Sequence, residues 1–277
     1  DIDPLSLLGA DPDPAVGWVR GMLYSGLTRL DDQLRPQPDL AEGWTVSPDG
    51  LIVTFTLHPD LRWSDGVPLT ADDVLYTYDV LRAGEARTGL QADLRDYVAA
   101  VTAPTTRTVA FVLNLRLANV LADAAFPILP RHIWGDLRPE EVQQADLLTQ
   151  PVGSGPFVLA ERRRGEALIM APNPRYHGPA PFLQEVAFLV APDPLVVEAA
   201  LRQGDLHVAV LPRQAYLSLQ DTPPRSPLSL AEHAAPQYTF VAFNLREGHP
   251  LADVRVRQAW ALALDKRQEV QEKQADY

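Results

Sequence analysis

Histidine and aspartate side chains are the groups in this 277-residue sequence that could support metal binding or acid–base chemistry. The six histidines are scattered, and no two stand at the i, i+4 spacing that places two ligands on one helix face. The sequence also lacks cysteine, which excludes thiolate ligands and nucleophiles. We therefore predict no metal site and no cofactor from the histidines, which are His58, His132, His177, His207, His233 and His249.

Two pairs of adjacent aspartates have a simpler explanation than catalysis. Asp31-Asp32 and Asp72-Asp73 are neighbours in the chain, and neighbouring residues of a helix or turn point in different directions. Helix capping and solvation explain them better than two carboxylates acting as acid and base. A hydrolase that uses Asp65 or Asp73 with a distant histidine is the competing enzymatic hypothesis, and no spacing in the sequence supports it.

Gly153-Ser154-Gly155 is the most distinctive glycine motif of the chain. It lacks the Lys-Ser/Thr of a phosphate-binding loop and the third glycine of a dinucleotide fingerprint, and Pro156 follows at once. Ser154 is also not in a G-x-S-x-G nucleophile elbow. We interpret the motif as a tight turn and predict that Gly153 and Gly155 form a hinge.

Composition narrows the class of protein. The formal net charge of -12 at pH 7 repels phosphate backbones, so nucleic acid is a poor partner. The longest apolar stretches, such as residues 186–191, are far shorter than the roughly 20 residues that span a bilayer. The five aromatic residues that could line a pocket are each expected in a core, and they are Tyr24, Trp44, Trp63, Tyr238 and Trp260.

Periodicity predicts hairpins and short helices in the first half of the chain. We expect a helix over residues 14–23 and a β-hairpin whose turn is Ser47-Pro48-Asp49-Gly50. A helix should follow Thr70 and Asp73, which resemble a capping box, with its buried stripe on Val74, Leu75, Tyr78 and Leu81. A strand is predicted over residues 108–113 and a helix near residues 118–125.

After Pro151 the pattern changes to strand, helix, strand. The predicted elements are a strand over 185–190, a helix over 194–203 closed by Gly204, and a strand over 206–210. Two apolar runs separated by a capped helix favour a parallel crossover and an α/β lobe. A further strand is expected over 239–245, and Asp253 should cap a last helix with Val256, Trp260, Ala263 and Leu264 on one face.

One long block of sequence resembles a known family. It runs from Leu23-Tyr24-Ser25-Gly26-Leu27-Thr28 through Pro38-Asp39-Leu40-Ala41-Glu42-Gly43-Trp44 to Arg62-Trp63-Ser64-Asp65-Gly66-Val67-Pro68-Leu69-Thr70-Ala71-Asp72-Asp73-Val74. Its order and spacing are similar to those of the family 5 extracytoplasmic solute-binding proteins of ABC importers, which include oligopeptide, dipeptide and nickel receptors.

Two later blocks extend the resemblance over nearly the whole chain. Gly153-Ser154-Gly155-Pro156-Phe157 with Asn173-Pro174-Arg175-Tyr176 resembles the family's return from its second lobe to its first. Phe243-Asn244 with the segment 253–266 resembles the entry to the third lobe. Ser25 stands where many peptide-binding members carry an acidic residue, which argues against a salt bridge to a peptide amine there.

The resemblance implies an α/β, periplasmic-binding-protein-like fold of the class II type. Residues 1–40 and 153–245 would form a discontinuous lobe I, residues 41–152 an inserted α+β lobe II, and residues 246–277 the beginning of lobe III. Family members continue through that whole third lobe, so we expect a chain truncated there. Closure of the lobes around a ligand would shift the population toward the closed state.

The same resemblance implies the function. It indicates a non-enzymatic receptor that delivers peptide or a similar small solute to ABC permease subunits, at the outer face of the cytoplasmic membrane or in the periplasm. A sensor or chaperone-like receptor without a transporter is the alternative within binding proteins. The ligand contacts carried over by position are Tyr24, Ser25, Gly26, Tyr238, Phe240 and Asn244.

Overall fold

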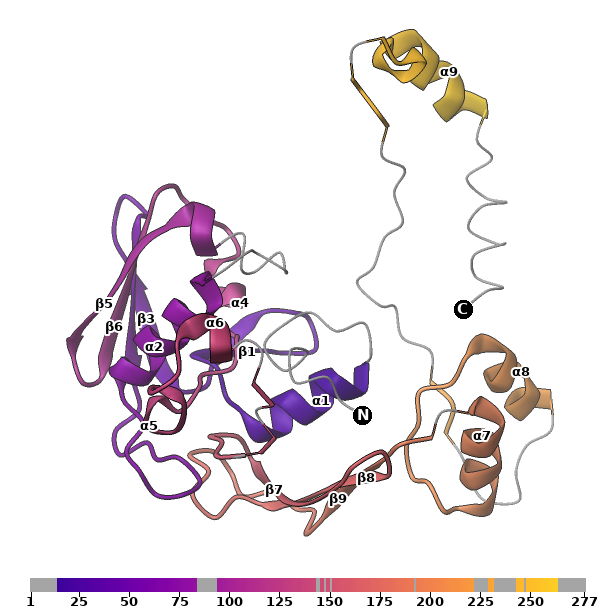
Figure 1. Cartoon of the computed structure of the whole chain (residues 1–277), viewed down its shortest axis with the longest axis horizontal. Helices are drawn as coiled ribbons and strands as arrows, with labels where there is room; N and C mark the ends of the chain where they lie inside the picture. Colours follow the sequence, from indigo (N-terminus) through magenta and orange to yellow (C-terminus); the bar gives the residue numbers. More distant parts are fainter. Residues whose placement is uncertain are drawn as a thin grey trace. The chain divides into compact units, whose positions relative to one another are not determined.

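The computed structural model divides the chain into two compact units, Asp1–Val190 and Ala191–Tyr277 (Figure 1). It describes residues 14–83, 94–142, 145, 146, 148, 149, 151–191, 193–221, 229–231, 243–246 and 248–263. Within these residues all strands lie in the first unit, and the second unit contains helices and connecting segments. None of the helices in the described ranges is long and apolar enough to cross a membrane.

The first described element is helix α1, Pro14–Leu23, as predicted. Proline suits the first helical turn because its missing N–H needs no partner there. Val16, Val19 and Leu23 are buried at helical spacing. Two short antiparallel strands follow, β1 (Thr28–Leu30) and β2 (Pro36–Pro38).

A four-stranded antiparallel sheet follows in the order β3-β4-β6-β5. Its strands are β3 (Ala41–Val46), β4 (Ile52–Leu57), β5 (Val98–Thr105) and β6 (Thr108–Leu113). The predicted hairpin is confirmed, and Gly50 adopts φ +72° in its turn, a conformation that glycine tolerates without steric cost. The predicted strand over 108–113 is β6, and its Val109, Phe111 and Leu113 are buried on one face.

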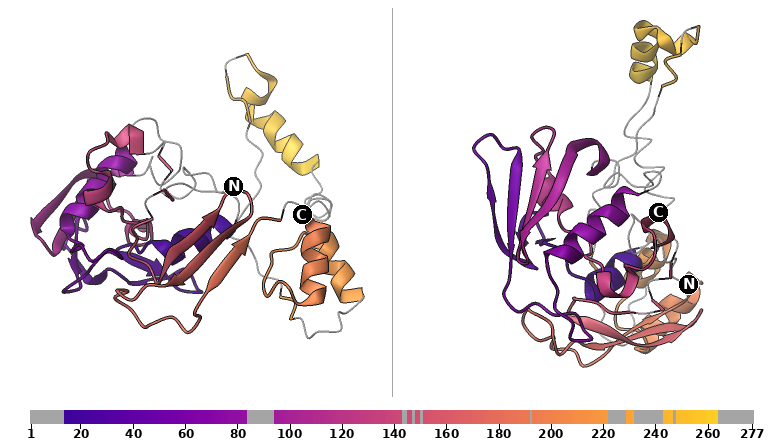
Figure 2. Two further views of the ribbon diagram at one scale, coloured as in Figure 1. Left: turned by 60° about the horizontal axis from the view of Figure 1, so that its bottom comes forward. Right: turned by 60° about the vertical axis from the view of Figure 1, so that its left-hand side comes forward.

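Helix α2, Ala71–Arg82, packs against this sheet through contacts with β5 and β6 (Figure 2). Asp73 accepts the Thr70 N–H at 2.9 Å, which is the predicted cap interaction. Val74, Tyr78 and Leu81 are buried and Leu75 is partly buried, so the predicted stripe is confirmed. The core between helix and sheet includes Leu40, Phe55, Leu57, Trp63, Val74, Tyr78, Leu81, Val109 and Phe111.

Three one-turn helices connect this sheet to the next, namely α4 (Val120–Asp123), α5 (Arg131–Trp134) and α6 (Pro139–Val142). The helix predicted near 118–125 is therefore only one turn long. Its last helical residue is Asp123, and Pro127 keeps the helix from continuing beyond Phe126, because proline disfavours helical dihedrals in the residue before it.

A three-stranded antiparallel sheet closes the first unit, in the order β7-β8-β9. The strands are β7 (Phe157–Arg163), β8 (Ala167–Pro172) and β9 (Val186–Leu189). Helix α1 contacts β7, so segments far apart in sequence share one core. The buried residues of this second core include Val19, Leu23, Tyr24, Val80, Leu129, Trp134, Val142, Phe157, Leu168 and Met170.

The parallel crossover predicted after Pro151 is wrong for the described residues. Strand β9 pairs antiparallel with β8, and residues 206–210 form no strand. A strand requires a partner edge for its backbone groups, and Val208 and Val210 are 73% and 59% exposed. The helix between them is confirmed as α7, Pro194–Gln203, with Asp193 accepting the Leu195 N–H and Gly204 at φ +85°.

The second unit also contains α8 (Arg213–Asp221), a 3₁₀ turn over Pro250–Ala252, and α9 (Val254–Ala263). Asp253 accepts the Arg255 N–H at 2.8 Å, which confirms the predicted cap of the last helix. Val256 and Trp260 are each 40% exposed, so the predicted apolar stripe is half open. Leu264 and most of the predicted strand over 239–245 lie outside the described residues, and residues 243–245 form no strand.

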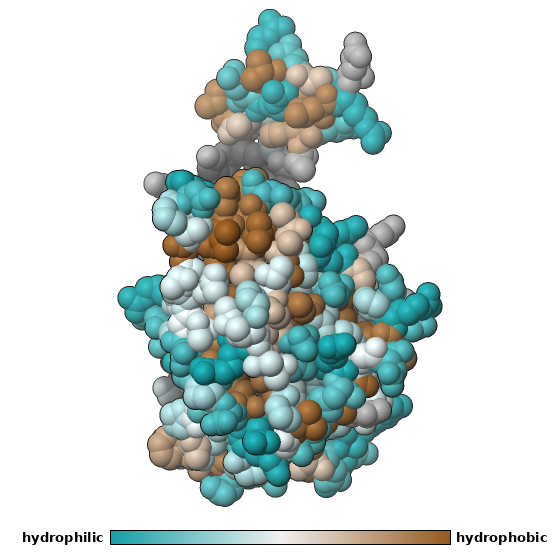
Figure 3. Space-filling view, turned by 90° about the vertical axis from the view of Figure 1, so that its left-hand side faces the viewer, coloured by the Kyte–Doolittle hydropathy of each residue, from teal (hydrophilic) through white to brown (hydrophobic). Residues whose placement is uncertain are grey.

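The surface agrees with the composition of the chain. Figure 3 shows a face on which hydrophilic residues predominate and hydrophobic residues form separate patches. Apolar residues scattered over a protein surface are normal and require no special explanation.

Candidate functional site

The predicted ligand loop, Tyr24–Gly26, follows α1 directly and is held by its backbone. The Ser25 N–H donates to Ser154 Oγ at 3.0 Å, and the Ser25 carbonyl accepts the Ile128 N–H at 3.1 Å. The Gly26 carbonyl accepts the Leu40 N–H at 3.0 Å. The loop is thus tied to three segments that are distant from one another in sequence.

The side chains of this loop point into the protein. Tyr24 and Ser25 are each 4% exposed. The Tyr24 hydroxyl is buried without a hydrogen-bond partner in the described part of the chain, and this burial raises its pKa above the usual range of a phenol. An ideal Cβ at Gly26 would lie 2.8 Å from the Ala125 backbone, so a side chain does not fit there. In this structure the whole Tyr24–Gly26 loop is therefore buried, and internal hydrogen bonds hold its backbone in place.

The Gly153–Gly155 turn packs on the same loop at very short range. A Cβ at Gly153 would lie 2.0 Å from the Leu23 carbonyl oxygen, and one at Gly155 would lie 2.4 Å from the Met22 carbonyl oxygen. The Gly155 N–H donates to the Leu23 carbonyl at 2.9 Å. Glycine is required at both positions because the two backbones touch, and neither residue has a positive φ. Hinge motion at Gly153 and Gly155 stays a prediction.

Asn173 fixes the other side of this turn. Its side-chain amide donates to the Gly155 carbonyl at 2.8 Å, and its own carbonyl oxygen accepts the Arg175 N–H at 2.9 Å. The Asn173 backbone N–H donates to the Pro156 carbonyl at 2.9 Å. Asn173 is only 4% exposed, and these bonds satisfy a polar group that would otherwise be costly to bury.

Ser64 joins the four-stranded part of the unit to the same turn. Its N–H donates to the Gly153 carbonyl at 2.9 Å, and its hydroxyl accepts the Gly153 N–H at 3.2 Å. Arg175 donates from Nη1 to the Ser64 carbonyl at 2.9 Å. We call the assembly of Leu23–Ser25, Ser64, Gly153–Gly155 and Asn173–Arg175 the glycine joint.

The carboxylates considered for acid–base chemistry have structural roles. The Asp73 carboxylate accepts the backbone N–H groups of Thr70 and Arg131 at 2.9 and 3.0 Å. Burial raises the pKa of Asp73, and these hydrogen bonds oppose that rise without cancelling it. Asp65 contacts His132 at 2.7 Å. Burial would raise the pKa of Asp65, but bonds from the Val67 N–H and His132 outweigh it, so its pKa is lowered.

The remaining predicted ligand contacts belong to the second unit. The Asn244 side chain accepts the Arg246 N–H at 3.2 Å in an exposed turn. Tyr238 and Phe240 lie outside the described residues. The structure therefore brings Tyr24, Ser25 and Gly26 together with Gly153 and Gly155 in the first unit, and Asn244 belongs to the second unit.

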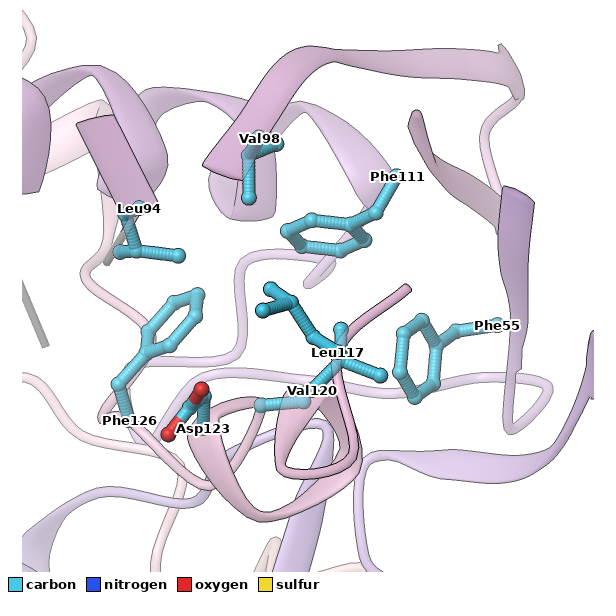
Figure 4. Close-up of a pocket in the computed structure, with 9 residues that line it drawn as sticks. Phe55, Leu94, Val98, Phe111, Leu117, Val120, Asp123 and Phe126 are labelled. Atoms are coloured by element: carbon cyan, nitrogen blue, oxygen red, sulfur yellow. The ribbon is translucent and has the colours of Figure 1, made fainter. Parts of the chain in front are cut away.

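A small apolar cavity lies in the first core (Figure 4). Its volume is ≈ 10 Å³, close to the minimum of about 10–15 Å³ that one water requires. Asp123 is the charged residue of its lining, and the others are Phe55, Leu94, Val98, Phe111, Leu117, Val120, Ala124 and Phe126. It is a packing gap and is too small for a peptide. Across the described ranges no three His, Asp or Glu side chains are grouped to hold a metal.

Comparison with known proteins decides the family. Residues 35–273 match the model of the bacterial extracellular solute-binding proteins, family 5 Middle. The chain belongs to this family. The family fold, periplasmic-binding-protein-like with mixed helix and sheet, agrees with the fold class expected from the sequence. The matched proteins are binding proteins rather than enzymes, and the family description places its members outside the cell.

Two curated relatives illustrate the similarity. Protein XP55 of Streptomyces lividans is 33% identical over 267 residues, covering 94% of this chain and 47% of that protein. The oligopeptide-binding protein AppA of Bacillus subtilis is 28% identical over 257 residues, covering 92% of this chain and 46% of that protein. The chain thus spans about half the length of the curated relatives it matches.

Solved structures agree with this assignment. The structure of AppA from Bacillus subtilis in complex with a nonapeptide superposes with a TM-score of 0.71 at 28% identity, covering 78% of this chain and 43% of that chain. NikZ from Campylobacter jejuni, solved in complex with Ni(L-His), gives a TM-score of 0.76 at 23% identity, covering 100% of this chain and 54% of that chain. The second likeness concerns the fold alone.

Sequence reasoning missed the roles of two polar residues in the glycine joint. Ser154 was interpreted as part of a turn, and Asn173 as part of a motif, yet both are buried acceptors or donors for distant backbone groups. The sequence did contain a signal for Ser154, because it stands between two glycines. Two glycines allow another backbone segment to approach closely, and the serine hydroxyl is then the side-chain group that can bond to it.

Proposed function

We propose that this chain is part of a receptor that binds peptides or similar small solutes outside the cytoplasmic membrane and delivers them to an ABC permease. The observation that carries the proposal is the similarity to AppA over 92% of the chain, together with the AppA structure that contains a nonapeptide. The carboxylates of the competing hydrolase hypothesis have structural partners: Asp73 accepts the Thr70 and Arg131 amides, and Asp65 accepts the Val67 N–H and contacts His132 at 2.7 Å.

The lobe arrangement expected from the sequence supports this proposal. In it, residues 41–152 form an insertion within a lobe made from the N-terminal segment and the segment after Gly153. Contact between α1 and β7 and the bond from the Gly155 N–H to the Leu23 carbonyl join those two outer segments. Solute would lie between this composite lobe and a third lobe, and closure would favour the bound state.

Peptide recognition in such a clamp uses main-chain hydrogen bonds for affinity and roomy, hydrated pockets for varied side chains. The Tyr24–Gly26 loop is assigned to this task by the family resemblance, and its hydrogen bonds to Ser154, Ile128 and Leu40 hold its backbone in place. Tyr24, Ser25, Gly26, Tyr238, Phe240 and Asn244 remain the proposed ligand contacts.

Mass spectrometry of ligands that co-purify with the natural full chain tests the function. We expect a population of short peptides or a related solute, released on denaturation and absent from a control protein purified in parallel. Incubation with the identified solute should leave it intact, as for a receptor. Turnover that is abolished by Asp65→Asn would instead support the hydrolase hypothesis and contradict the proposal.

A further inference from the structure

The hydrogen bond between Ser25 and Ser154 is buried and joins two segments that are remote in sequence. The donor is a loop amide and the acceptor is a side-chain hydroxyl 129 residues away, at 3.0 Å. Ser154 is 2% exposed and Ser25 is 4% exposed. The Ser25 amide in this structure is therefore satisfied by the Ser154 hydroxyl in a place that bulk water does not reach.

We propose that Ser154 is a positioning residue that sets the backbone conformation of the Tyr24–Gly26 loop for ligand binding. This inference rests on the proposed function, because it assigns the loop to the binding face. Ser154 itself is buried and does not touch the solute. It acts through the Ser25 amide, whose bond determines where the neighbouring Tyr24 and Gly26 peptides lie.

The packing around Ser154 makes this position rigid. Gly153 and Gly155, on either side of it, approach the Leu23 and Met22 carbonyl oxygens too closely for any side chain. The Gly155 carbonyl is held by Asn173 at 2.8 Å, and the Gly153 N–H is held by the Ser64 hydroxyl at 3.2 Å. Backbone packed this closely cannot change its dihedral angles without separating the two segments, so the joint is held in one conformation in this structure.

A fixed joint has a functional consequence. A loop whose conformation is set before the solute arrives loses little conformational freedom on binding, and that preorganisation improves affinity. Without the Ser154 hydroxyl, the Ser25 amide would be buried without a partner, and the loop would move to hydrate it. Affinity should then fall although no group that touches the solute has changed.

Two matched substitutions in the natural full chain test the proposal. Ser154→Ala removes the hydroxyl that accepts the Ser25 N–H, and Ser47→Ala removes a hydroxyl that accepts the Ile52 N–H at 2.9 Å in the β3–β4 turn, outside the glycine joint. Each substitution deletes one hydroxyl oxygen that accepts a backbone N–H, but only Ser154→Ala removes a hydrogen bond to the Tyr24–Gly26 loop. The measurements are amide hydrogen exchange at Ser25 in the ligand-free protein and the affinity for the peptides that co-purify with the wild type.

We expect Ser154→Ala to speed exchange at the Ser25 amide by about tenfold or more, because local opening no longer has to break that bond. Its peptide affinity should fall by a similar factor, whereas Ser47→Ala, which lies outside the joint, should change both quantities by less than about threefold. Unchanged exchange at Ser25 in Ser154→Ala would overturn the proposal. Faster exchange with unchanged affinity would overturn the link to binding.

The exchange measurement also separates this proposal from the proposed function. A wild-type protein that binds no peptide would refute the receptor function, while Ser25 exchange would still decide whether Ser154 fixes the loop. Ser154→Thr, which keeps the hydroxyl, should restore slow exchange. If Ser154→Ala does not fold, hydrogen exchange of the wild-type protein still tests the proposal. A Ser25 amide that exchanges as fast as one in an unfolded chain would show that the buried bond to Ser154 does not protect it.

Discussion

Asp73 accepts two backbone hydrogen bonds, whereas its neighbour Asp72 forms an exposed ion pair. Its two carboxylate oxygens accept the N–H groups of Thr70 and Arg131, so it caps α2 and anchors the start of α5 at once. Asp72 is an exposed residue whose closest cation is Arg131, at 3.6 Å. Position within the fold, rather than residue type, separates the two.

Asp73→Asn should destabilise the protein, because an asparagine side chain has one acceptor oxygen where two amides need one each. We expect a loss of about 1–3 kcal/mol in the free energy of unfolding, measured by urea denaturation near neutral pH. Asp72→Asn is the control and should stay within about 0.5 kcal/mol of the wild type. Equal effects of the two substitutions would contradict the double-cap role of Asp73.

The glycine joint gives a second prediction at the residue scale. Gly155→Ala places a Cβ 2.4 Å from the Met22 carbonyl oxygen, so the two backbones must separate. The expected cost is about 1–3 kcal/mol of unfolding free energy, as for overpacking elsewhere. Gly21→Ala is the matched control in α1, where a Cβ meets no atom within 4 Å, and it should stabilise by about 0.4–1 kcal/mol. Thermal melting of both variants decides the sign.

At the scale of elements, Tyr76 connects α2 to α5. Its hydroxyl donates to the Trp134 carbonyl at 2.7 Å, which joins a helix of the first core to a segment of the second. Burial raises the pKa of Tyr76 from 10.0 to about 12. The folded protein thus stabilises the protonated, neutral form of the Tyr76 phenol relative to the ionised form.

This shift predicts a loss of stability in alkali. Because the folded pKa is above the unfolded value, the contribution of Tyr76 is fully present below pH 10 and is lost as the pH rises toward about 12. Tyr76→Phe lacks this ionisation, so the stability difference between wild type and variant should shrink over that range. Urea denaturation at several alkaline pH values measures it. A constant difference would show that Tyr76 ionises alike in the folded and unfolded chain.

At the scale of the whole molecule, both hydrophobic cores lie within Asp1–Val190. We therefore predict that residues 1–190 fold cooperatively when expressed without the second unit. Circular dichroism and a single sharp thermal transition check this. A chain that binds a hydrophobic dye and melts gradually would show that the second unit is needed for the first to pack.

Ligand affinity belongs to the whole protein rather than to one unit. In a clamp, affinity comes from contacts on both faces and from exclusion of water on closure. We predict that these 277 residues, which span about half the length of the curated relatives they match, bind the solute more weakly than a protein of the relatives' full length. Calorimetry measures the affinity of each of the two proteins for the solute. Affinities that differ by less than about threefold, or roughly 0.7 kcal/mol, would contradict the clamp.

The sequence by itself determined the elements whose signals are local. Helix α1, the β3–β4 hairpin, α2 with its Asp73 cap, β6, and α7 between Asp193 and Gly204 all appeared as predicted. In each of them caps, turn residues or apolar periodicity within the segment suffice to predict the element, even where its packing partner is distant, as β4 is from β6.

Tertiary structure decided which distant segments meet. The sequence shows that residues 186–189 suit a strand, but pairing with β8 rather than with residues 206–210 depends on which backbone edge is available in three dimensions. The glycine joint is a case of the same kind, because the hydrogen bonds that join Ser64 and Ser25 to its Gly153–Ser154 turn span 89 and 129 residues. Local preferences fix how each segment bends, whereas the choice among remote partners depends on burying all segments together in one core.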